Sequence, residues 1–108
     1  MDASELEIAL LSEFHALYGA NGFPSPSEVV VVSRDNTGGG RYVQVSASNR
    51  VTLKDGYYDL GGKFIQMQGV PNGMMAVARI VESDLLGIEI TVYGGDYWDG
   101  KERAWSLE

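Results

Sequence analysis

The chain has 108 residues, enough for one domain with its own core, and 44% of them are hydrophobic, as is usual for globular proteins. It contains no cysteine, which excludes disulfides, thiolate catalysis and cysteine-based zinc sites and favours a reducing, cytoplasmic location. The net charge is −7 and the 8 Lys and Arg residues are scattered, so we expect no binding to nucleic acid or to a membrane.

Residues 4–18 have the pattern of an amphipathic helix. Ser4 and Glu7 have the spacing of a capping box, in which each side chain accepts a hydrogen bond from the backbone of the other residue. Apolar side chains then recur every three or four residues in one stripe, and others widen the apolar arc: Leu6, Leu10, Phe14 and Leu17 in the stripe, with Ile8, Leu11 and Tyr18 beside it. Such a wide arc favours cover on more than one side, from the chain itself or from a second subunit. Glycines and prolines after residue 18 end the helix.

From residue 28 onward the pattern changes to short strands. Alternating or β-branched side chains predict strands over 28–34, 41–48, 63–70, 74–82, 88–93 and 103–107, with a short strand at 51–54 that is followed by 57–60. Pro71-Asn72-Gly73 is the clearest turn signal, and Asp55-Gly56 indicates a hairpin. Residues 83–87 are predicted to form a loop or a single helical turn. Short connections favour antiparallel pairing. We therefore predict a single α+β domain over 1–108, with an N-terminal helix packed on a curved antiparallel sheet of about six strands.

No group of residues has the spacing of a catalytic, metal or nucleotide site. His15 is the only histidine, which rules out a catalytic triad or a multi-histidine metal site within one chain. The glycines at 38–40 are followed by a predicted strand rather than by the helix of a phosphate-binding loop. Asp96 and Asp99 lack the spacing of a calcium loop. We therefore assign no catalytic residue, metal ligand or cofactor, and we favour a non-enzymatic role.

Arg79 is unusual because it interrupts the apolar run from Met74 to Val81. A buried arginine needs a carboxylate partner, and Glu89 falls within about two positions of Arg79 if strands 74–82 and 88–93 pair as a hairpin. Arg79 is then half of an internal ion pair, an exposed residue near an edge, or an anion-binding group inside a cavity. Aromatic residues after position 55 lie near strand ends or in loops, where they form a binding surface or cover the second face of the sheet. The candidate ligand-binding residues are Arg79, Glu89, Tyr57, Tyr58, Tyr97 and Trp98.

Over all 108 residues the chain resembles the small proteins encoded on mobile integron gene cassettes. Proteins of that group are short, cytoplasmic and often oligomeric, and most are of unknown function. The resemblance therefore implies a cytoplasmic oligomer, and it implies nothing about site residues.

Three functions fit these patterns. The first is a non-enzymatic domain that associates with itself as a homodimer or binds a protein partner, because open sheet edges and a wide apolar helix arc invite pairing. The second is a protein that binds a small apolar or anionic ligand in a cavity between sheet and helix. The third is an acidic inhibitor or immunity-type protein that blocks a basic active site. We prefer the first, and within it the homodimer.

Overall fold

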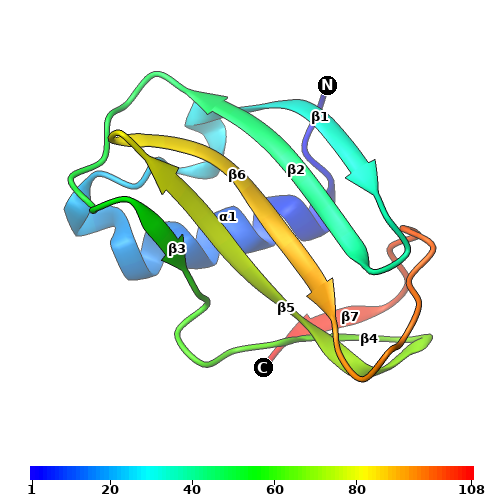
Figure 1. Ribbon diagram of the computed structural model, residues 1–108. Coiled ribbons are helices and arrows are strands. Elements are labelled where there is room, and N and C mark those ends of the chain that lie inside the picture. The colour runs from blue at the N-terminus through cyan, green and yellow to red at the C-terminus, as the bar shows by residue number, and fades with distance from the viewer.

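An N-terminal helix lies on a seven-stranded antiparallel sheet in the computed structural model, which describes residues 1–108 (Figure 1). The helix α1 (Glu5–Tyr18) is followed by two short 3-10 turns, Gly19–Asn21 and Pro26–Glu28. The strands are β1 (Val29–Asn36), β2 (Gly40–Ala47), β3 (Gly56–Tyr58), β4 (Ile65–Met67), β5 (Val70–Val81), β6 (Asp84–Val92) and β7 (Trp105–Leu107). The predicted α+β class, with one helix packed on an antiparallel sheet, is confirmed.

The capping box starts α1 as predicted. The Ser4 hydroxyl accepts the Glu7 backbone N–H at 3.2 Å, and the Glu7 carboxylate accepts the Ser4 backbone N–H at 2.9 Å. The stripe is buried except at Leu17, which is 43% exposed in the last turn, where its side chain lies against Gly61. Ile8, on the flank of the arc, is 46% exposed. The chain therefore leaves part of the apolar arc uncovered. No helix combines the length and the apolar character needed to cross a membrane.

The strands lie in the order β1-β2-β6-β5-β4-β7. The longest strand, β5, pairs with β6 along one side and with both β3 and β4 along the other. Strand β6 is inserted between β2 and β5, so that the β5–β6 hairpin forms the centre of the sheet. Strands β1 and β7 are its edges.

The hairpin between β5 and β6 is tighter than the sequence indicates. Its turn is Glu82–Ser83, both with positive φ (50° and 68°), and β6 begins at Asp84, so the predicted loop at 83–87 is wrong. Asn-Gly is the usual signal for such a turn, and it is absent here. A distant segment holds the turn instead: Asp55 accepts the Glu82 N–H at 2.8 Å, and the Val51 N–H donates to the Ser83 carbonyl at 2.9 Å. Val51 and Asp55 therefore brace this turn. Residues 51–54 form no strand, and the hairpin predicted at Asp55-Gly56 is wrong because β3 pairs with β5.

The predicted turn at Pro71-Asn72-Gly73 is also wrong. These residues lie within β5, and the chain reverses at Gln68–Gly69. Gly73 has φ 72°, which allows an irregularity where β4 and β5 shift register. The backbone N–H and side-chain amide of Asn72 donate to the Asp96 carboxylate at 2.8 and 3.1 Å. The Asn72-Gly73 pair therefore lies within a strand and contacts a distant loop through Asn72, and it forms no turn.

The hydrophobic core lies between α1 and one face of the sheet. It contains 21 buried hydrophobic residues, and in β5 it takes alternate positions: Met74, Ala76, Ala78 and Ile80. The intervening residues Met75, Val77 and Arg79 are half-buried on the other face. Figure 1 shows α1 behind the central strands, with no segment of the chain in front of them. One face of the sheet therefore lacks cover from this chain.

Candidate functional site

The uncovered side of the sheet brings together apolar, aromatic and charged side chains from the strands β2, β3, β5 and β6. We call it the open face and define it by Tyr42 and Gln44 of β2, Tyr57 of β3, Met75, Val77 and Arg79 of β5, and Glu89 and Thr91 of β6. In β2, β5 and β6 these residues alternate with buried residues of the core face, whereas Tyr57 lies between two half-buried residues of β3. Tyrosine, arginine and methionine are the residue types enriched in protein–protein interfaces.

The register of β5 against β6 sets the centre of the open face. Arg79 lies opposite Gly87, and Val77 lies opposite Glu89, so Arg79 and Glu89 occupy the two ends of one diagonal. The ring of Tyr42 covers Gly87, because a Cβ atom added there would come within 2.9 Å of the tyrosine hydroxyl. Val77 and the Tyr42 ring are therefore the apolar centre between one positive and one negative charge.

Arg79 and Glu89 have no charged partner within the chain. Neither belongs to any of the six ion pairs of the structure, so the internal pair considered from the sequence does not form. The guanidinium carbon of Arg79 lies 5.9 Å from the centroid of the Tyr57 ring, within the range of a cation–π contact. A hollow of about 200 Å³ adjoins Glu89 and is also lined by Tyr42 and Thr91. The open face thus presents a free cation, and a free anion beside a small hollow.

The other predicted site residues lie elsewhere. The Tyr58 ring turns toward the helix, 5.4 Å from the Tyr18 ring, and its hydroxyl donates to the Lys54 carbonyl at 2.6 Å. Trp98 is buried, and Tyr97 is exposed in the loop beside Gly38. Of the six candidates, the structure therefore brings together Arg79, Glu89 and Tyr57.

A buried ionic cluster links α1 to the sheet and to the C-terminal segment. We call it the Glu7 cluster; it comprises Glu7, Arg34, Arg41 and Glu102. The Glu7 carboxylate accepts two hydrogen bonds from Arg34, from Nε at 2.6 Å and from a terminal guanidinium nitrogen at 2.5 Å. It accepts a third from Arg41 at 3.1 Å. Arg41 also donates to Glu102 at 2.5 Å. Two cations therefore face two carboxylates, and the cluster is electrically balanced.

The Glu7 cluster is built as a structural anchor. Every buried side-chain nitrogen and oxygen in the chain has a hydrogen-bond partner, so no group of the cluster is left free for a ligand. The Trp98 ring lies 4.6 Å from the Arg41 guanidinium carbon and covers it. Burial by itself would raise the pKa of Glu7, but hydrogen bonds from Arg34 and Ser4, with the charges of Arg34 and Arg41, outweigh it and lower that pKa. Glu7 therefore stays ionised in the folded protein at neutral pH.

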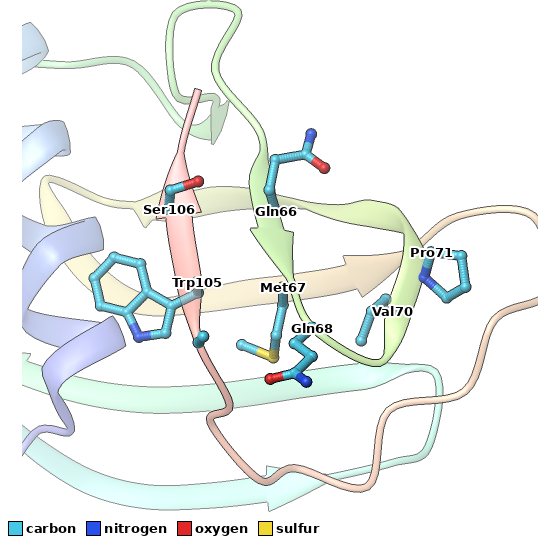
Figure 2. Close-up of a pocket in the computed structure, with 8 residues that line it drawn as sticks. Gln66, Met67, Gln68, Val70, Pro71, Trp105 and Ser106 are labelled. Carbon is cyan, nitrogen blue, oxygen red and sulfur yellow. The ribbon is translucent and has the colours of Figure 1, made fainter.

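Two further hollows lie at the ends of the sheet. One, of about 540 Å³, lies between the N-terminal segment, Ile8 and the start of β1. The other, of about 420 Å³, lies along β4 and β7 (Figure 2). In the second, Gln66 and Ser106 form one cross-strand pair, Met67 and Trp105 form the next, and successive pairs face opposite ways. Figure 2 shows that the polar groups do not point to a common centre. No three His, Cys, Asp or Glu side chains lie close enough together to hold a metal ion.

Sequence reasoning missed the apolar members of the open face. Met74–Val81 reads as apolar on both faces, but its inward positions 76 and 78 are alanines beneath α1, whereas positions 75 and 77 carry larger side chains. This alternation of size was the available signal. No such signal exists for the Glu7 cluster, whose members are far apart in the chain. In comparisons with known proteins, no family model, curated protein or solved structure matches the chain.

Proposed function

We propose that this protein is a non-enzymatic domain that associates with itself as a homodimer, with the open face of the sheet as its contact surface. The observation that carries the proposal is a sheet with one face packed on α1 and the other face, rich in apolar and aromatic side chains, left without cover. An antiparallel sheet that faces water carries a polar second face. Here the middle of that face contains Val77, Met75 and Tyr42 beside the charged Glu89.

The composition of the open face favours a protein partner over a small ligand. Val77 and the Tyr42 ring form the apolar centre of the open face, with Met75 next to Val77 on the same face of β5, and polar residues such as Gln44 and Thr91 lie around it. An apolar centre with a polar rim is the usual anatomy of a protein interface. The space between helix and sheet, where a small ligand would have to bind, is filled by the 21 core residues.

The proposal is tested by the mass of the native protein, measured by light scattering after size exclusion over a tenfold range of concentration. We expect a dimer for the unmodified chain and a monomer for Val77→Lys, because a charge at the centre of the contact would have to be buried without a partner. Ile8→Lys is the matched control, since it places the same charge at a partly exposed apolar residue on α1. Circular dichroism shows whether both variants keep the fold.

Ile8→Lys also tests the rival surface, the exposed part of the helix arc. The proposed contact surface is wrong if Ile8→Lys is monomeric while Val77→Lys remains a dimer. A monomeric mass for the unmodified protein over the whole concentration range would overturn the proposed function itself.

A further inference from the structure

The charges of the open face are complementary to those of a second copy of the same face. Arg79 and Glu89 are both half-buried, lie on adjacent central strands, and are without ion-pair partners in the chain. Burying either charge alone in an interface would be costly, so a partner that covers this face must supply an anion for Arg79 and a cation for Glu89. A copy of this chain supplies both.

The register of β5 and β6 makes the two charges interchangeable by a two-fold rotation. The positions of Arg79, Gly87, Glu89 and Val77 form one four-sided unit, with the two charges on one diagonal and Val77 and Gly87 on the other. A two-fold axis that lies parallel to the sheet and runs along the Val77–Gly87 diagonal exchanges the places of Arg79 and Glu89. Val77 and the Tyr42 ring over Gly87 then lie close to the axis.

We infer that two copies pack open face against open face about this axis, so that Arg79 of each copy pairs with Glu89 of the other; the inference rests on the proposed self-association. The hollow of about 200 Å³ that Glu89 lines has room for the tip of an incoming arginine side chain, and the guanidinium of Arg79 lies over the Tyr57 ring of its own sheet. The two ion pairs flank the apolar centre at Val77. Because such a contact is self-complementary, it closes after two copies and builds no filament.

Charge reversal tests the pairing. Arg79→Glu and Glu89→Arg each place two like-charged contacts in the dimer, and we expect each variant alone to raise the dimer dissociation constant about 100-fold or more. Mixing the two single variants in equal amounts should restore a dimer. In that heterodimer the two substituted side chains, now of opposite charge, face each other on one side, and the original Arg79–Glu89 pair is kept on the other. Lys101→Glu, at an exposed lysine in the C-terminal loop, changes the net charge by the same amount as Arg79→Glu and is the control for that variant.

Each outcome has a separate meaning. If both single variants dimerise as well as the unmodified protein, the pairing is wrong, while the contact through Val77 can still stand. If both are monomeric and only the double variant Arg79→Glu/Glu89→Arg recovers, the pairing lies within one chain and the inference falls. It falls equally if the single variants are monomeric and neither the mixture nor the double variant recovers. Recovery in the mixture of single variants is the result that supports the inference.

Discussion

Glu7→Gln gives the most direct measure of what the buried ionic cluster contributes. The Glu7 side chain is 0% exposed and that of Arg41 is 3% exposed, so the substitution removes a negative charge that water does not replace. It leaves the two guanidinium groups with only Glu102 as counter-charge. Removing one partner of a buried ion pair costs about 3–5 kcal/mol. Glutamine still accepts the Ser4 backbone N–H, so the capping box is kept and the loss reports the ion pairs.

The assay is urea unfolding at pH 7, followed by circular dichroism at matched protein concentration, since self-association would make stability depend on concentration. Glu13→Gln is the control on the same helix. The Glu13 carboxylate lies 2.9 Å from Lys63, but their side chains are 27% and 46% exposed, and such pairs contribute about 1 kcal/mol or less. We therefore expect a large loss of unfolding free energy for Glu7→Gln and a small one for Glu13→Gln. A loss under about 1 kcal/mol for Glu7→Gln would refute the reasoning about burial.

The stability lost in Glu7→Gln should depend on pH. The pKa of Glu7 is lower in the folded protein than in the unfolded chain, so its contribution to stability is fully present above the unfolded value of about 4.3. That contribution is lost as the pH falls through the lower folded value. The difference in unfolding free energy between the unmodified protein and Glu7→Gln should therefore be constant near neutral pH and shrink below about pH 4. A difference that stays constant down to about pH 2 would contradict this assignment.

Two further predictions concern the core and the sheet. Phe14 is fully buried, and its ring centroid lies 5.7 Å from that of Phe23, so Phe14→Ala should lower the unfolding free energy by about 3–5 kcal/mol. Leu17→Ala, at a partly exposed residue, should cost less than about 1 kcal/mol. Equal losses for the two variants in urea unfolding would argue against the packing described. Gly40→Ala would place a Cβ atom against the Ile90 carbonyl oxygen and should therefore weaken the β2–β6 pairing. We expect it to lower the unfolding free energy by about 3 kcal/mol and to speed amide hydrogen exchange at Arg41 and Tyr42. Unchanged exchange at these two residues would show that the strands tolerate the side chain.

Local features of the chain could be predicted from the sequence because neighbouring residues encode them. The Ser4–Glu7 capping box depends on a spacing of three residues, and the stripe of Leu6, Leu10 and Phe14 depends on the helical repeat. The alternation in β2, with Val43 and Val45 buried and Gln44 exposed, depends on the repeat of two in a strand. One helix, several strands and short connections were enough to predict the α+β class.

What depends on pairing between distant segments required the tertiary structure. The turn at Glu82–Ser83 is stabilised by Asp55 and Val51, and the Asn72-Gly73 pair contacts Asp96 within a strand, so local turn chemistry predicted the wrong positions. The Glu7 cluster joins the helix, β1, β2 and the C-terminal segment through bonds between residues far apart in the chain.

The open face shows the same division. The sequence by itself determined that Arg79 lies in an apolar strand and that Glu89 is close by in a hairpin. Only the register between β5 and β6 decided that the two charges lie on a diagonal with Val77 and Gly87 between them. A shift of one residue would have moved every side chain of the strand to the opposite face. That register depends on the packing of the whole sheet on α1, to which residues throughout the chain contribute, and no short segment of sequence contains it.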